Sequence, residues 1–467
     1  MVERSTGCLL CVKRRVKCDE RIPGCLRCET YGASCPGYNR SFKFITAKPY
    51  RSRRKRKLPS SEREELDRAR TIQKSTSFPM AQNDLSTSGK TRLQSPVLAD
   101  LNVTQCLERL TDEISQPFPS TSGYVISRWF SFLPELYGRN KTLDVSLKAF
   151  VAHHVGNVTL NKQAVQYARS AYLEALSRLR KSLSNPSESL SSEVHCSVLL
   201  LCLYELFADT RSGDIWMRHA KGLTHLTKAR GVASFRAPFD SVLLKASRGL
   251  IVMYALFGGE ECLLASDDWH CIMRQECNRG LSATLNDLVE EFFTYFSLSP
   301  SLVHRLYSLK EADGTVPATL VKVSTLLKEA LDLRDKLILW HGLFTRVAPI
   351  PHEILSSIGE TVYPTVLWYS DVNSATIYCG YYSYMVLIHE ILKTCGYPGE
   401  HGAIVAYFVD QICKSVEFTS QGLLGPYRMG FPLRVAWEVA NLRTKTWISG
   451  CLRNFSEFYA VLREDNF

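Results

Sequence analysis

Apolar side chains recur at intervals of three and four residues along much of the chain after about residue 122. This spacing places them on one face of an α-helix. The clearest series ends just before Asn185-Pro186, a dipeptide that stops a helix. Its members are Val165, Ala168, Tyr172, Leu176, Leu179 and Leu183.

Two further helices are predicted directly after this one. Residues 194–208 are nearly all apolar, which indicates a buried helix, and residues 214–230 end at Gly231, where a C-terminal glycine cap is expected. Strand-like alternation bounded by hairpin dipeptides is scarce, so residues 121–467 are predicted to form a large all-α domain. Because no uninterrupted apolar run reaches about 18 residues, no membrane span and no membrane partner are expected.

A compositional change separates this domain from the N-terminus. Residues 58 to about 120 are rich in Ser, Thr and Gln and poor in aromatic residues, so residues 46–120 are predicted to be a basic arm and disordered linker. Residues 62–74 contain Leu66 and Ile72 but no repeated heptad, which argues against a coiled coil there. A homodimer would therefore form through the large domain.

The first 35 residues contain a repeated cysteine pattern. The sequence Gly-Cys-Leu-x-Cys, followed six residues later by a third Cys, occurs twice at an interval of 17 positions. So short a segment cannot build a hydrophobic core, and must be stabilised by disulfides or metal. Disulfides require an oxidising compartment, and the N-terminus shows no apolar signal segment, so zinc is the expected crosslink.

Cys-x2-Cys pairs suit tetrahedral zinc. Six cysteines fill the eight ligand positions of two four-coordinate ions only if two sulfurs are shared. The symmetric choice makes Cys8 and Cys25, the first thiols of the two halves, the bridges. The first zinc would then bind Cys8, Cys11, Cys18 and Cys25, and the second Cys8, Cys25, Cys28 and Cys35. The alternative is a single zinc ion with spare thiols.

This segment resembles the fungal binuclear zinc cluster, the six-cysteine, two-zinc DNA-binding module of fungal transcription factors. The spacing Cys-x2-Cys-x6-Cys-x6-Cys-x2-Cys-x6-Cys fits that family without a gap, and Lys17 through Glu20, Pro23 and Gly32 also match. Val12 departs from it, since the family often has a basic residue there. The resemblance implies a zinc-cluster domain over residues 1–45, with two short helices around two zinc ions and the cluster at 8–35.

The two halves of the repeat differ in charge. Residues 12–17 contain four cations, whereas the matching residues 29–34 contain none. The first half is therefore expected to face double-stranded DNA. The resemblance implies base reading, usually of a CGG-like triplet in the major groove, which we expect of Arg14 and Arg15, with Lys13 and Lys17 contacting phosphates. Alternatively, all four are phosphate anchors without base preference.

Net charge is concentrated at the N-terminus. Residues 1–60 hold 16 Lys and Arg against 4 Asp and Glu, while the chain holds 57 against 46. The remaining residues are thus nearly neutral, and only this segment should attract nucleic acid. It includes a dense basic run, expected to bind a nuclear import receptor and so to direct the protein to the nucleus. The run comprises Arg51, Arg53, Arg54, Lys55, Arg56 and Lys57.

The large domain resembles the second type of fungal-specific transcription factor regulatory domain. The similar pieces, in order, are residues 129–138, 143–144, 204–207, 216–231 and 248–269. The resemblance implies an all-helical region that regulates the factor and binds effectors or partners such as the transcription machinery.

No pattern in the chain indicates an enzyme. His389-Glu390 begins like a zinc-protease motif, but Lys393 occupies the position of the second histidine, and His352-Glu353 fails in the same way. Phosphate-binding, nucleophile-elbow and dinucleotide motifs are absent.

The sequence thus predicts a zinc-dependent, sequence-specific regulator of RNA polymerase II transcription. The resemblance implies that it regulates one pathway, such as a secondary-metabolism gene set. The alternative is a co-regulator that acts through protein contacts and binds DNA non-specifically.

Overall fold

The structure is a computed structural model that describes residues 9–19, 25–33, 35, 102–115, 125–208, 215–274, 280–311, 317–422 and 424–456. The chain divides into two compact units, residues 1–44 and 45–467. The basic run at 51–57 and most of the predicted linker lie outside the described residues. Each unit is described by itself.

The small unit contains two five-residue helices, α1 (Leu9–Lys13) and α2 (Leu26–Thr30). Each helix begins immediately after the first cysteine of its half of the repeat. The second cysteine of each pair therefore lies within the helix, on the turn that follows. This places Cys11 and Cys28 on α1 and α2, where both side chains are buried.

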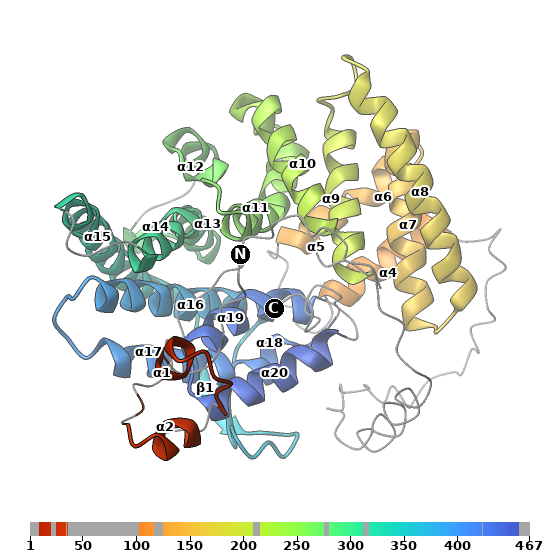
Figure 1. Ribbon diagram of the computed structural model, residues 1–467. Helices are drawn as coiled ribbons and strands as arrows, with labels where there is room; N and C mark the ends of the chain where they lie inside the picture. Colours follow the sequence, from red (N-terminus) through yellow and green to blue (C-terminus); the bar gives the residue numbers. More distant parts are fainter. Residues whose placement is uncertain are drawn as a thin grey trace, which may run out of the picture. The chain divides into compact units, whose positions relative to one another are not determined.

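The large unit is mostly helical, as predicted (Figure 1). Its helices are α4 (Val103–Ser115), α5 (Val125–Phe130), α6 (Leu133–Leu136), α7 (Lys141–Val158), α8 (Lys162–Ser184), α9 (Ser192–Phe207), α10 (Ile215–Arg230), α11 (Pro238–Gly258), α12 (Asp267–Met273), α13 (Leu285–Phe296), α14 (Ser299–Glu311), α15 (Pro317–Val347), α16 (Val372–Thr394), α17 (His401–Lys414), α18 (Val416–Thr419), α19 (Gly425–Val439) and α20 (Leu442–Ser456). Short 3-10 helices are η3 (Val232–Phe235), η4 (Leu263–Ala265) and η5 (Gly280–Ser282).

The predicted linker over residues 46–120 is wrong at its C-terminal end, where α4 forms. Val103, Leu107 and Leu110 on this helix are buried, and α4 packs against α5, α6 and α7. The spacing of four and three among these residues is helical, but the series is short and its surroundings are polar in composition. Burial of these three side chains therefore stabilises a helix in a segment whose average composition predicts disorder.

The three helices predicted around residues 165–231 are confirmed as α8, α9 and α10, with α7, α8 and α9 lying side by side in Figure 1. Helix α9 is buried over nearly its whole length. The buried seam of α8 differs from the predicted apolar face, because Leu183 is 46% exposed. The seam consists mainly of small side chains, which allow α7 to approach closely: Ala164, Ala168, Ala171 and Ala175.

Helix α11 qualifies the expectation about membrane spans. In the described part of the chain it is the one helix long and apolar enough to cross a membrane, although 67% of its most apolar window is buried within the protein. Its charged residues Lys245 and Arg248 interrupt the apolar run and both contact Glu290 of α13. Burial of this kind is what a core helix of a folded domain shows.

Helix α16 is the centre of the C-terminal half. It is buried almost throughout and packs against α13, α14, α15, α17, α18 and α19. Polar atoms of aromatic side chains on α16 and on its neighbour α15 donate to backbone carbonyls. The Tyr384 hydroxyl donates to the Tyr295 carbonyl at 2.6 Å, and the Trp340 indole N–H donates to the Leu288 carbonyl at 2.9 Å.

One β-hairpin interrupts the described helices. Strands β1 (His352–Leu355) and β2 (Thr365–Trp368) pair antiparallel, with His352 opposite Trp368. Trp368 packs edge-on against Phe418 of α18, with ring centroids 5.0 Å apart. The strands are four residues long and joined by a loop too long for a two-residue hairpin turn, so the dipeptide signature of a hairpin is missing.

Three histidines of the large unit have lowered pKa values. His195 is fully buried, and its Nε2 lies 3.1 Å from the Ser247 hydroxyl oxygen. That hydroxyl donates to the Leu243 carbonyl at 2.7 Å, so His195 Nε2 must be the donor to it. Burial, with a smaller effect from the Arg230 charge, lowers the pKa of His195 to about 3. Burial likewise lowers the pKa of His219 and of His389 to about 4.

We expect the free energy of unfolding to fall as the pH drops below about 6.5, because the unfolded histidines take up protons that the folded ones exclude. The free energy of unfolding has its full value above pH 6.5. It decreases as the pH falls from 6.5 toward the lowered pKa of the folded histidines. For His195 the loss between pH 7.5 and 5.5 is roughly 1.4 kcal/mol. Urea denaturation of wild type and His195→Gln at the two pH values measures it. An equal pH dependence for the two proteins would contradict this role of His195.

Candidate metal centre and nucleic-acid interface

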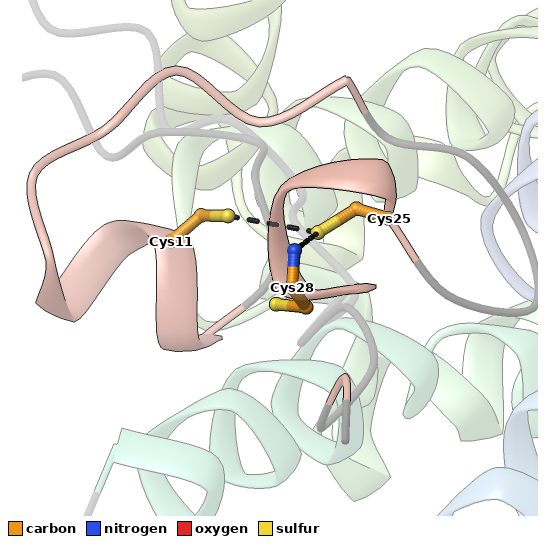
Figure 2. Close-up of side chains that lie close together, drawn as sticks. All are labelled: Cys11, Cys25 and Cys28. Atoms are coloured by element: carbon orange, nitrogen blue, oxygen red, sulfur yellow. Dashed lines mark hydrogen bonds between the residues drawn. The ribbon is translucent and has the colours of Figure 1, made fainter. Parts of the chain in front are cut away.

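Three cysteine thiols converge where α1 and α2 meet (Figure 2). Cys11 Sγ lies 3.6 Å from Cys25 Sγ, and the Cys28 backbone N–H donates to Cys25 Sγ at 3.3 Å. A sulfur separation of 3.6 Å is far longer than a disulfide bond of about 2.0 Å. It is close to the roughly 3.8 Å edge of a tetrahedron whose zinc–sulfur bonds are about 2.3 Å. These thiols are therefore spaced for a shared zinc ion.

Cys25 belongs to two groups of ligand atoms. Its Sγ lies within 4.8 Å of the sulfurs of Cys11 and Cys28, and also within 4.8 Å of Cys18 Sγ and an Asp19 carboxylate oxygen. Cys18 and Cys35 are half-buried and pack against the buried thiols. Cys8 lies outside the described residues. Among the described cysteines, Cys25 is thus the one placed between the first and second halves.

Asp19 connects the two halves through the backbone. Its carboxylate oxygens accept from the N–H groups of Leu26 at 3.1 Å and Arg27 at 3.5 Å, at the start of α2. Since the first N–H groups of a helix have no partner within the helix, an acidic side chain there stabilises it. Although Asp19 lies near two thiols, its position is that of a helix cap.

The turn that ends each helix is repeated together with the cysteines. The Val16 N–H donates to the Cys11 carbonyl at 3.1 Å, and 17 residues later the Ala33 N–H donates to the Cys28 carbonyl at 3.1 Å. Each turn contains one residue in the left-handed conformation. That residue is Gly32 in the second half, with φ 71°, but Arg15 in the first, with φ 56°.

The left-handed position favours glycine, because any other side chain costs roughly 1–2 kcal/mol there. The second half follows this rule and the first does not. Backbone strain of this kind is typical of residues whose side chain has a function.

All four predicted DNA-binding cations are among the described residues. Lys13, Arg15 and Lys17 are exposed, whereas Arg14 is half-buried. The Arg14 guanidinium lies over the ring of Tyr31 on the second half, 3.4 Å from its centroid. Neither this contact nor the Asp19 cap is predicted by the cysteine spacing or by the charge pattern. The interval of 17 residues between Arg14 and Tyr31, equal to the cysteine interval, could have indicated the first.

Most described cysteines of the large unit are buried and have the environment of inert core thiols. Burial raises the pKa of Cys262 and of Cys379 to about 11, so neither is a thiolate at neutral pH. Cys271 is exposed, and Cys277 lies outside the described residues. Within the described parts of the chain, the groups of side chains spaced for a metal ion all involve the N-terminal cysteines.

The histidine that begins the incomplete protease motif has a different role. His389 Nδ1 lies 3.0 Å from His401 Nδ1, and His401 Nε2 lies 3.0 Å from the Tyr397 carbonyl oxygen. Glu390 pairs instead with Lys393, at 3.4 Å. The contact between His389 and His401 joins α16 to α17, as in a helix–helix interface, whereas the pair of Glu390 and Lys393 lies within α16.

Comparison with known proteins finds two matching families along the chain. Residues 6–43 match the fungal Zn(2)-Cys(6) binuclear cluster domain, and residues 111–338 match the fungal-specific transcription factor domain. The chain therefore contains the zinc-cluster domain and the helical domain of fungal Zn(2)-Cys(6) transcription factors, a family of regulators and not of enzymes. The cluster of this family holds two zinc ions, and the grouped thiols fit them.

Two relatives are similar over part of the chain. An uncharacterized protein of Emericella nidulans is 26% identical over 198 residues, 41% of this chain and 42% of that protein. White-opaque regulator 2 of Candida albicans is 64% identical over 33 residues, 7% of each chain. The chain thus covers less than half the length of either relative. No solved structure matches it.

Proposed function

We propose that this protein is a nuclear transcription factor that requires zinc and binds double-stranded DNA in a sequence-specific manner. The observation that carries the proposal is the asymmetry of the repeated turn. Both halves have the same cysteine spacing and the same helix-ending hydrogen bond. Cations occur in the first turn segment, residues 12–17, and are absent from the matching residues 29–34, and one of them, Arg15, occupies the strained position that is glycine in the second turn.

In this proposal the six cysteines bind two zinc ions, with Cys8 and Cys25 bridging. The place of Cys25 between Cys11, Cys18 and Cys28 supports its part. Bound zinc supplies the folding free energy that so small a unit lacks. Asp19 holds the start of α2, and the thiols hold α1 against α2, so the cation-bearing turn has a fixed orientation.

Base reading would then come from Arg14 and Arg15, at the end of α1. An arginine can donate two parallel hydrogen bonds to O6 and N7 of guanine in the major groove, which suits a CGG-like triplet. Lys13 and Lys17 are exposed point charges and would contact phosphates. The two matched domains, and the regulator among the relatives, support a role in transcription.

The remaining partners follow from the same function. The basic run from Arg51 to Lys57 would bind a nuclear import receptor. The helical unit would contact the transcription machinery and form the homodimer. Regulation of one gene set, such as a secondary-metabolism pathway, belongs to this proposal as well.

Arg15→Gly separates DNA reading from folding. Glycine suits the left-handed turn, so the variant should retain its zinc as well as wild type does or better. It should nevertheless lose about 1–3 kcal/mol of discrimination between a CGG-containing duplex and a scrambled one. Affinities for both duplexes at physiological salt, with zinc content of the same samples, measure the two effects.

Lys17→Ala is the matched control for Arg15→Gly. Loss of a phosphate contact should weaken binding to both duplexes alike and lower the salt dependence by about one counterion. Equal losses on the two duplexes for both variants would contradict the division into base-reading and phosphate-binding residues. A wild-type protein with no preference for either duplex would favour the co-regulator that binds DNA non-specifically.

A further inference from the structure

Arg14 and Tyr31 occupy equivalent positions in the two halves of the repeat. They are 17 residues apart, the same interval that separates Cys11 from Cys28 and Arg15 from Gly32. Each directly precedes the left-handed residue of its turn. Equivalent residues of two halves related by an approximate symmetry axis can touch only near that axis. Arg14 and Tyr31 are in contact.

The contact is close enough to restrain the arginine. Its guanidinium carbon is 3.4 Å from the centroid of the Tyr31 ring, the separation of a cation packed against an aromatic face. Arg14 is half-buried, and its Nη1 is buried with no hydrogen-bond acceptor among the described residues. Tyr31 is 60% exposed, so the ring is not held in place as part of a core.

A stacked guanidinium keeps its hydrogen-bond donors, because they lie in its own plane and not toward the ring. An arginine free in solvent populates many rotamers and loses that freedom on binding DNA. An arginine already held on a ring has less rotamer freedom to lose when it binds DNA. Stacking can therefore strengthen a base contact without adding a contact of its own to DNA.

We propose that Tyr31 is a positioning residue for DNA recognition, because it holds the Arg14 guanidinium in place. The second half of the repeat, whose turn has no cations, would then contribute to base reading through Arg14 of the first half. The inference rests on the proposed function. It adds a specificity-determining residue in the second half, where the charge pattern indicates no role in DNA binding.

The test is a double-mutant cycle in the full-length, zinc-loaded protein, with Tyr31→Ala, Arg14→Ala and the double variant. Tyr31→Ala should lower the ratio of specific to scrambled affinity about threefold to tenfold. In the Arg14→Ala background the same change should have no further effect. Tyr31→Phe keeps the ring and should keep the ratio. Leu26→Ala, which shortens an exposed side chain on α2, the helix that Tyr31 caps, is the matched control.

Two additional measurements distinguish positioning from support of the fold. Zinc content and the slope of affinity against salt should be unchanged in Tyr31→Ala, because neither the ligands nor the number of phosphate contacts changes. An unchanged ratio in Tyr31→Ala, independent effects of the two substitutions, or a loss of zinc that explains the lost binding would each overturn the inference. An absent preference in wild type would instead overturn the proposed function.

Discussion

Cys25→Ala should bind a CGG-containing duplex no better than a scrambled one, and the N-terminal unit should no longer hold zinc. Cys25 is the thiol that lies within reach of Cys11 and Cys28 and also of Cys18. In the proposed cluster, where Cys8 and Cys25 bridge, removing Cys25 takes one ligand from each zinc ion. Zinc contributes on the order of 10 kcal/mol or more to the folding of small metal-binding domains, so the unit should unfold.

Zinc content and binding to the two duplexes measure this effect, and chelation of the wild-type protein should reproduce it. Cys18→Ala should also abolish specific binding. The control is Cys271→Ala, which removes an exposed thiol of the large unit and should change neither zinc content nor affinity. Sequence-specific binding by the fully metal-free protein would refute the zinc cluster.

Glu290→Ala should lower the free energy of unfolding of the large unit by about 3–5 kcal/mol. Glu290 is 6% exposed and accepts from Arg248 Nη1 at 2.5 Å, while Lys245 Nζ lies 3.5 Å from its other oxygen. The Arg248 side chain is 2% exposed and its guanidinium lies 3.5 Å from the Phe293 ring centroid. Without the carboxylate, the Arg248 charge would remain buried with no anion beside it.

Urea denaturation followed by far-UV circular dichroism measures the loss, since most helical residues belong to this unit. Glu174→Ala is the control. It removes a pair with Arg178 whose side chains are 52% and 39% exposed, and should cost less than about 1 kcal/mol. Replacing both partners, with Arg248→Met and Glu290→Leu, should recover much of the stability. Equal losses for Glu290→Ala and Glu174→Ala would contradict the importance of burial.

The helices of the large unit were predictable where neighbouring residues alone determine where a helix forms and ends. An apolar series ending at Asn185, a capped apolar run and a terminal Gly231 each identify a helix without knowledge of the fold. The hairpin at β1 and β2 was not predictable, because its partner strands are short and its packing depends on Phe418, far along the chain. Helix α4 was missed because three buried apolar residues are too few to change the composition of a polar segment.

The metal centre was predictable in its ligand types, because cysteine spacing alone determines which zinc chemistry is feasible. The geometry around it was not. The strain at Arg15, the Asp19 cap and the contact of Arg14 with Tyr31 all depend on how α1 meets α2. Charge identified the half that should face DNA, but charge does not distinguish an exposed cation such as Lys13 from one held on an aromatic ring.

Selection from randomised duplexes with the full-length, zinc-loaded protein tests the central claim most directly. We expect enrichment of CGG-like triplets, and paired triplets if the large unit forms the dimer. The same selection with a fragment of residues 1–120 should then enrich single triplets. Absence of any enriched sequence from either protein would contradict sequence-specific recognition. It would leave a basic segment, folded by zinc, that binds DNA without reading it.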